Sequence, residues 1–208
     1  MAELTFYYGV MGCSKSANAL MTRWEQESKG RKPWLIKPAT DNRDDIQTES
    51  GIMPVVRSRI GLFAIATAID ADEHIAMPAD TKVIICDEAQ FLQPFQVDEL
   101  NEIAKDLNIP VICYGLRTDF KTHFFPGSQR LFEIADRLIE LETTCDCGAK
   151  AVISSKFLDG DIVLDGDQID IGGDEKYKAM CFDCYTKLKK SIEKELLKAA
   201  RLKEKENN

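Results

Sequence analysis

LTFYYGVMGCSKS, residues 4–16, joins a short apolar and aromatic run to a loop that holds two glycines and ends in Lys15 and Ser16. The run Leu4–Tyr8 predicts a buried strand, and the spacing of apolar residues predicts a helix over Ser16–Lys29. A strand that leads through a glycine-bearing turn to a helix N-terminus points backbone N–H groups at one place, where the helix dipole also favours an anion. This segment therefore predicts a phosphate-binding loop.

The loop departs from the pattern G-x-x-x-x-G-K-[ST] at one position, because Ser14 precedes Lys15 where a glycine is expected. If residue 14 has a left-handed backbone, its side chain costs roughly 1–2 kcal/mol. Lys15 would reach the β- and γ-phosphates of a nucleotide, and the Ser16 hydroxyl would bind Mg²⁺. An ordinary strand-to-helix turn with a chance Lys-Ser remains the alternative. The loop residues expected to contact ATP and Mg²⁺ are Gly9, Val10, Met11, Gly12, Cys13, Ser14, Lys15 and Ser16.

Apolar runs alternate with amphipathic segments as far as residue 142. Further strands are predicted at Trp34–Lys37, Lys82–Cys86, Pro110–Tyr114 and Arg137–Leu141, and further helices at Phe95–Leu107 and Ser128–Ala135. Strands that alternate with helices imply a parallel sheet covered on both faces. The polar stretch Thr40–Gly51 interrupts this order and is predicted to be a mobile loop.

Two acidic residues follow the predicted strand at residues 82–86. Asp87 is the expected oxygen ligand for Mg²⁺ opposite the phosphates. Glu88 points elsewhere because it is the next residue, and it is placed to accept a proton from an attacking hydroxyl or water. Two solvated turn residues are the alternative, which the upstream glycine loop makes less favourable.

Composition limits the classes of function. The chain has 208 residues, a formal net charge of −8 and a pI of about 4.9. Such a charge opposes binding to duplex phosphates, so no nucleic-acid partner is expected. No apolar run of about 18 residues and no basic segment before an apolar run is present, which predicts neither a membrane span nor a signal peptide. We expect a cytoplasmic protein.

Four of the seven cysteines form two close pairs, Cys145/Cys147 and Cys181/Cys184, with 33 residues between the pairs. Two thiolate pairs on tight turns can complete a closed tetrahedral site, which predicts structural zinc. Two disulfides are the alternative, disfavoured in a reducing compartment.

Two alternating runs, Ala151–Leu158 and Asp161–Ile171, surround an Asp159-Gly160 hairpin signal between the cysteine pairs. We expect three parts: a nucleotide-binding domain over 1–142, a zinc-binding domain over 143–186, and a C-terminal amphipathic helix over 187–208.

Six short motifs occur together in this chain: YGVMGCSKS, DNR at residues 41–43, SRIG at 58–61, DEAQF at 87–91, CYGLRTDF at 113–120 and IGGDEKYKAMC at 171–181. In this order, and from Leu4 to Tyr185, the chain resembles the zinc-containing thymidine kinases. The resemblance implies an α/β fold with a RecA-like P-loop parallel sheet flanked by helices, together with a small zinc-binding lasso domain. It implies transfer of the γ-phosphate of ATP to the 5′-hydroxyl of thymidine.

The resemblance also assigns roles to single residues. Glu88 matches the catalytic base, and the ATP and Mg²⁺ positions extend to Asp41, Arg43, Asp87, Ala89 and Gln90. The residues that match the thymidine pocket are Met11, Phe91, Leu116, Phe120, Phe125, Gly172, Gly173 and Tyr177. The lasso corresponds to residues 165–177. A homotetramer and feedback inhibition by thymidine triphosphate are further expectations of the resemblance.

Two other functions remain open at this stage. An ATPase of the RecA or helicase kind would use Glu88 to activate water, although this chain lacks a second motor domain and a basic track for nucleic acid. A zinc-ribbon interaction module with a degenerate nucleotide loop is the second possibility, and Ser14 is the residue that favours it.

Overall fold

The computed structural model describes residues 1–169 and 176–206. Its centre is a six-stranded sheet in the order β10-β1-β9-β8-β2-β7, in which every neighbouring pair is parallel. The strands are β1 (Leu4–Gly9), β2 (Pro33–Pro38), β7 (Thr67–Ile69), β8 (Val83–Cys86), β9 (Val111–Leu116) and β10 (Arg137–Glu140). The predicted parallel sheet is confirmed, and five of its six strands lie within two residues of their expected positions.

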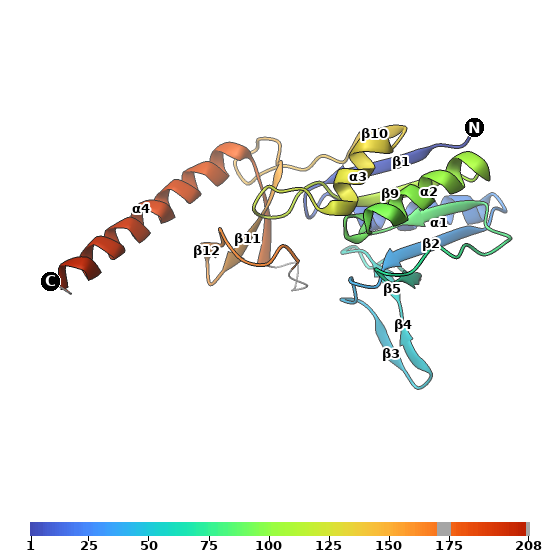
Figure 1. The fold of residues 1–208 in the computed structure, drawn as a ribbon, viewed down its shortest axis with the longest axis horizontal. Helices are drawn as coiled ribbons and strands as arrows, with labels where there is room; N and C mark the ends of the chain where they lie inside the picture. Colours follow the sequence, from blue (N-terminus) through green and yellow to red (C-terminus); the bar gives the residue numbers. More distant parts are fainter. Residues whose placement is uncertain (170–175, 207–208) are drawn as a thin grey trace.

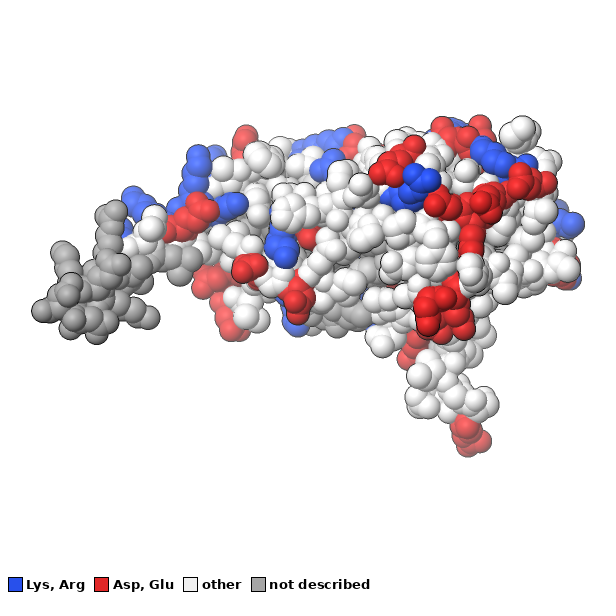
Figure 2. All heavy atoms as spheres, in the orientation of Figure 1, with Lys and Arg blue, Asp and Glu red and all other residues white. Residues whose placement is uncertain are grey.

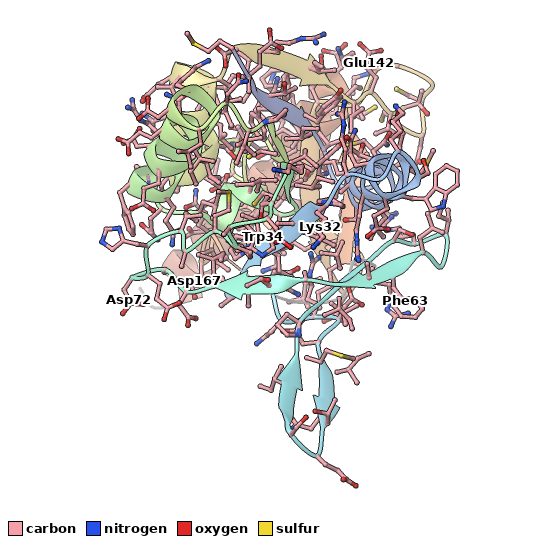
Figure 3. All side chains as sticks on the ribbon, turned by 90° about the vertical axis from the view of Figure 1, so that its right-hand side faces the viewer. Lys32, Trp34, Phe63, Asp72, Glu142 and Asp167 are labelled. Atoms are coloured by element: carbon pink, nitrogen blue, oxygen red, sulfur yellow. The ribbon has the colours of Figure 1, made fainter. Side chains whose placement is uncertain are left out.

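Helices cover both faces of this sheet (Figures 1 and 3). They are α1 (Lys15–Ser28), α2 (Pro94–Asp106) and α3 (Pro126–Ile134), with the short 3₁₀ helix η1 (Ala89–Phe91) before α2. Ile85 belongs to the core beneath α1, whereas its neighbour Ile84 belongs to the core beneath α2 and α3. Because successive side chains of a strand point to opposite faces, strands buried on both sides need the continuous apolar runs seen in the sequence.

The second half of the stretch predicted to be a mobile loop, Thr40–Gly51, belongs to a hairpin, which corrects that part of the expectation. Strands β3 (Ile46–Thr48) and β4 (Gly51–Met53) pair antiparallel, and the hairpin projects from the body of the molecule (Figure 1). A second hairpin follows, with β5 (Val55–Arg57) and β6 (Phe63–Ile65). These strands have three residues each and no apolar alternation long enough to stand out in the sequence.

A second sheet contains β11 (Ile153–Leu158), β12 (Asp161–Ile162) and β13 (Tyr177–Met180), and its order is β12-β11-β13. The hairpin predicted at Asp159-Gly160 is confirmed, since both residues have the positive φ angles, 51° and 95°, that a tight primed turn needs. The predicted second strand, 161–171, was too long: β12 ends at Ile162, and residues 170 and 171 lie outside the described part.

The C-terminal helix α4 (Phe182–Glu206) begins earlier than the expected Lys187, directly after Cys181. It extends from the second sheet away from the six-stranded sheet (Figure 1). Figure 2 shows acidic and basic side chains interspersed on the face that it draws. None of the helices within the described ranges is both long and apolar enough to cross a membrane.

Candidate active site

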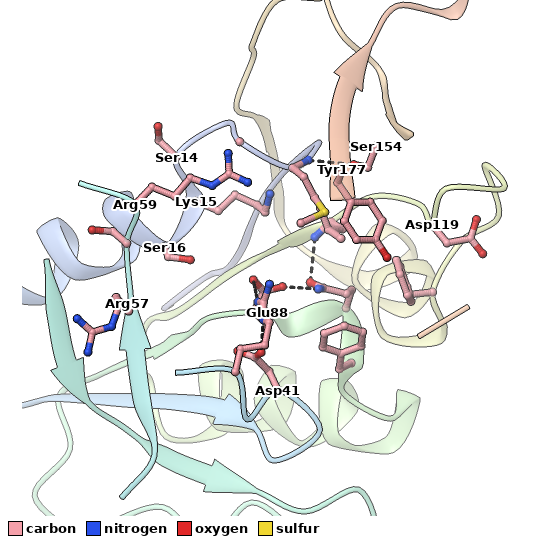
Figure 4. Close-up of a pocket in the computed structure, with 18 of the residues that line it drawn as sticks. Ser14, Lys15, Ser16, Asp41, Arg57, Arg59, Glu88, Asp119, Ser154 and Tyr177 are labelled. Carbon is pink, nitrogen blue, oxygen red and sulfur yellow. Dashed lines mark hydrogen bonds and ion pairs between the residues drawn. The ribbon is translucent and has the colours of Figure 1, made fainter. Parts of the chain in front are cut away.

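A cleft with about 1130 Å³ of open space lies at the carboxyl ends of the central strands, between the two sheets. The predicted site residues that line it are Met11, Gly12, Ser14, Lys15, Ser16, Asp41, Arg43, Glu88, Gln90, Phe91, Leu116, Phe120, Phe125 and Tyr177 (Figure 4). Five others do not line it: Gly9, Val10, Cys13, Asp87 and Ala89. Gly172 and Gly173 lie outside the described residues. The segments at 9–16 and 87–91, which are far apart in sequence, therefore meet in one place.

Two residues of the loop between β1 and α1 have positive φ angles. Ser14 has the left-handed backbone considered above for this position, with φ 65° and ψ 28°, and Gly12 has φ 81°. A residue with a Cβ in this region costs roughly 1–2 kcal/mol, so Ser14 carries the strain that a glycine would avoid. Gly9 is required for a different reason, because a Cβ there would lie 2.5 Å from both Cys13 Sγ and the Leu141 carbonyl oxygen.

Lys15 is buried and curls back over its own loop, where its Nζ donates to the Val10 carbonyl at 2.8 Å. The backbone N–H of Met11 donates to Ser154 Oγ at 2.9 Å, which ties this loop to β11 of the second sheet. The loop is thus held from both sides, with the ammonium group of Lys15 facing the cleft. That arrangement places one cation and a helix N-terminus where an anion would bind.

Asp87 ends β8 and is almost fully buried. Its Oδ1 has no hydrogen-bond partner among the described residues. Burial, followed by the charge of Glu88, raises the pKa of Asp87 to about 7, while the hydroxyl of Ser16 acts in the opposite direction. A buried carboxylate oxygen without a partner is costly unless a cation neutralises it, so this atom suits a hard cation such as Mg²⁺.

Glu88 is fixed by a network at the edge of the cleft. Its Oε1 accepts from Arg43 Nη2 at 2.7 Å, and its Oε2 accepts from Gln90 Nε2. Burial alone would raise the pKa of Glu88, but the charges of Arg43 and Lys15 outweigh burial, and the pKa of this carboxyl lies below its usual value. Glu88 is therefore ionised at neutral pH, as a proton acceptor must be.

Gln90 connects Glu88 to the neighbouring strand. While its Nε2 donates to Glu88, its Oε1 accepts the backbone N–H of Leu116 at 2.9 Å. The side chain passes close to Gly115, where a Cβ would lie 2.9 Å from Gln90 Oε1. A glycine at position 115 therefore permits this contact, which ties η1 to the end of β9.

The opposite end of the cleft is apolar and aromatic. The rings of Phe91 and Phe125 meet edge to face with centroids 5.6 Å apart. Phe120 is buried, and Lys156 Nζ lies 5.3 Å from its ring centroid. The cleft is thus polarised, with charged groups at the loop end and a flat apolar slot at the other end, as a ligand with an anionic tail and a planar ring requires.

Several cleft residues received no individual role from sequence reasoning. They are Ala17, Asp44, Arg57, Ser58, Arg59, Ile60, Thr118, Asp119, Ser154, Gln168 and Ile169. The two arginines of RSRIG, residues 57–61, were a visible signal, since cations suit a phosphate site. Asp119 lies within the motif at residues 113–120, but Gln168 gave no such signal, and the contact between the two joins residues that are 49 positions apart.

The four paired cysteines form one cluster, with ligand atoms that all lie within 4.8 Å of one another. All seven cysteines are free thiols in the structure, as ligation of a metal ion by the four paired ones requires. Four sulfurs at about 2.3 Å from a central ion stand about 3.8 Å apart, so the donor set and its spacing fit a tetrahedral metal ion.

Taken together, the fold and the cleft place the chain among α/β proteins that bind ligands at the carboxyl edge of a parallel sheet. The family model for thymidine kinase matches residues 2–185. The chain belongs to the thymidine kinase family.

Thymidine kinases from several organisms match this chain over nearly their full length. The chain is 40% identical to a thymidine kinase of Zymomonas mobilis, covering 87% of this chain and 94% of the relative. It is 39% identical to one of Vibrio cholerae (89% and 97%) and 38% identical to one of Enterobacteria phage T4 (92% and 100%). A solved Pif1 helicase from Candida albicans overlaps 67% of this chain and 36% of its own, with a TM-score of 0.36 and 16% identity.

Proposed function

We propose that this protein transfers the γ-phosphate of ATP to the 5′-hydroxyl of thymidine. The observation that carries the proposal is the cleft itself, in which Lys15 of the glycine loop and the ionised carboxylate of Glu88 line one space. A triphosphate at the loop would present its terminal phosphate to an alcohol held beside Glu88. Family membership favours thymidine as that alcohol.

The roles of the residues follow from the geometry of the cleft. Backbone N–H groups at the N-terminus of α1 and the ammonium of Lys15 would bind the phosphates, and Arg43 would stabilise charge on the transferring group. Glu88 would accept the 5′-hydroxyl proton while the oxygen bonds to the γ-phosphorus and the bond to the β-phosphate oxygen breaks. Both Glu88 oxygens already accept one hydrogen bond, but a carboxylate has about four acceptor sites and keeps room for another.

Mg²⁺ would arrive with ATP, and Ser16 and the unpartnered Oδ1 of Asp87 are the residues that would hold it. The cation neutralises phosphate charge when bound.

We extend the proposal to a RecA-like P-loop relationship for the six-stranded sheet, which the strand–loop–helix at residues 4–28 supports.

The aromatic end of the cleft would hold the base. Phe91, Phe120, Phe125 and Tyr177 offer flat apolar surface to a pyrimidine, and Met11 and Leu116 complete the slot. The expected roles of Gly172 and Gly173 stay predictions. The division into 1–142, 143–186 and 187–208 also stays a proposal, which the separation of the two sheets supports.

We assign structural zinc to the cysteine cluster, since four thiolates leave no open coordination position for chemistry. Cys145 and Cys181 pack in one core with Ile153 and Met180 of the second sheet, so a bound ion would stabilise the strands beside the cleft.

Reduced, metal-binding cysteines also support a cytoplasmic location. A homotetramer and inhibition by thymidine triphosphate remain proposals based on family membership.

The test is a substrate screen with MgATP and single nucleosides. We expect thymidine monophosphate and ADP in equal amounts, with little ATP turnover when no nucleoside is present. ATP hydrolysis that depends on DNA rather than thymidine would instead support the motor ATPase. Nucleotide binding without any transfer would support the interaction module.

A further inference from the structure

Asp119 is a buried carboxylate that takes part neither in the proposed phosphate binding nor in the cysteine cluster. It is 3% exposed and lies in the loop that follows β9, at the aromatic end of the cleft. Its Oδ1 accepts the backbone N–H groups of Lys121 and His123, both at 2.9 Å. These two bonds close the loop locally and leave Oδ2 directed out of it.

Oδ2 accepts from Gln168 Nε2 at 3.0 Å, across 49 positions of sequence. The same amide nitrogen donates to the Phe124 carbonyl at 3.0 Å. Both partners are acceptors only, so the amide must present its N–H₂ group to them, which fixes the orientation of Gln168. Because one partner is charged and buried, its bond is among the stronger kinds.

A second contact ties the same two segments together. Lys121 Nζ donates to the carbonyl oxygen of Gly166 at 2.6 Å. Gly166 has φ +136°, and a Cβ on it would lie 3.9 Å from Phe120 Cζ, so the backbone at residue 166 passes close over this ring. Residues 165–169 are therefore held at two points above an aromatic residue of the cleft.

We propose that Asp119 and Gln168 form a latch that holds residues 165–169 over the aromatic end of the cleft and thereby sets the affinity for the nucleoside. This inference rests on the proposed function for the identity of that ligand. Asp119 and Gln168 are positioning residues, since the latch acts by placing backbone and Ile169 beside the base. Its loss weakens nucleoside binding and leaves ATP binding at the other end of the cleft unchanged.

Two single variants break the bond between residues 119 and 168 and keep the local hydrogen bonds of the loop after β9. In Asp119→Asn, the new side-chain oxygen still accepts both backbone N–H groups, but its N–H₂ group faces the N–H₂ group of Gln168. In Gln168→Ala the carboxylate keeps its own loop closed and loses only the distant donor. Each variant is expected to raise the KM for thymidine about tenfold, the effect of one hydrogen bond to a charged group. The KM for ATP is expected to stay within about twofold, well inside that effect.

The double variant Asp119→Asn with Gln168→Glu restores the bond between the two side chains with its polarity reversed, because the new amide donates to the new carboxylate, but it loses the donation to the Phe124 carbonyl. It is expected to bind thymidine better than Gln168→Glu alone, in which two carboxylates face each other, and a general loss of structure would not produce that gain. Gln129→Ala is the matched control, since Gln129 Nε2 donates to Glu133 on the exposed side of α3, outside the cleft. This control should behave as the wild type.

Hydrogen exchange of the ligand-free protein gives a readout that does not depend on the substrate. Peptides covering residues 160–169 should exchange faster in both single variants, and more slowly in the double variant than in Gln168→Glu alone. Unchanged thymidine KM in both single variants would overturn the latch, as would unchanged exchange. If the wild type fails to phosphorylate thymidine, the proposed function fails, and the exchange experiment still decides whether the two residues hold the segment.

Discussion

Arg43 Nη2 lies 2.7 Å from Glu88 Oε1, and Nε of the same guanidinium donates to Asp41 Oδ1 at 2.6 Å. Asp41 in turn faces the fully buried ammonium of Lys37 at 3.7 Å. Arg43 therefore joins the carboxylate at the end of β8 to the segment that follows β2. This contact both orients Glu88 and keeps it ionised.

Removing the charge of Arg43 should shift the pH dependence of activity. Because Arg43 lowers the pKa of Glu88, Arg43→Gln raises that pKa, and the base becomes protonated at a higher pH than in the wild type. The acid limb of the kcat/KM profile should move upward. Arg43→Lys keeps a positive charge and should shift the limb less. If the acid limb of Arg43→Gln stays at the wild-type pH, Arg43 does not control the ionisation of Glu88.

Ser14→Gly should relieve backbone strain in the loop. With φ at 65°, the serine occupies a region that glycine enters freely, so the variant should be more stable by about 1 kcal/mol and bind ATP at least as well. Urea unfolding and the KM for ATP measure the two effects. Asp159→Gly, at the hairpin turn with φ 51°, is the control that relieves similar strain outside the cleft. A large loss of ATP affinity in Ser14→Gly would mean that the serine side chain itself binds the nucleotide.

Cys145→Ser should lose bound zinc and thymidine affinity together. Cys145 shares a core with Ile153 of β11, and the next residue on that strand, Ser154, accepts from the backbone of Met11 in the phosphate loop. Metal content by atomic absorption and thymidine binding by calorimetry measure the two losses. Asp146→Asn is the matched control, because residue 146 lies between two cysteines and is exposed. Thymidine affinity that persists in a zinc-free Cys145→Ser protein would contradict the structural role of the metal.

Much of the fold was predictable because its signals are local. The five predicted strands of the central sheet are apolar runs, and the loop at residues 9–16 is marked by its glycines and lysine. The meeting of that loop with Glu88 followed from topology, since parallel strands in one sheet end at the same edge. β7 was not predicted because it contains only Thr67–Ile69 and one of its three residues is buried.

The remaining cleft contacts depend on how distant segments pack. Arg59 approaches Gly12, with its Nη1 3.4 Å from the place of a Cβ there, only because the β5–β6 hairpin folds beside the phosphate loop. Likewise, the bond between Asp119 and Gln168 needs the second sheet to lie against the loop after β9. Neither pairing leaves a periodic or compositional trace, so a single sequence gives no means to find it.

The central claim is that Glu88 accepts the proton of a nucleoside hydroxyl beside an ATP held by residues 9–16. The most direct measurement is single-turnover transfer from γ-labelled ATP to thymidine by the wild type and by Glu88→Gln, which keeps the shape of the side chain and its contact with Arg43. We predict labelled thymidine monophosphate from the wild type, a rate lower by a factor of about 10²–10⁴ in the variant, and equal ATP binding in both. Transfer at the wild-type rate by Glu88→Gln would contradict the account.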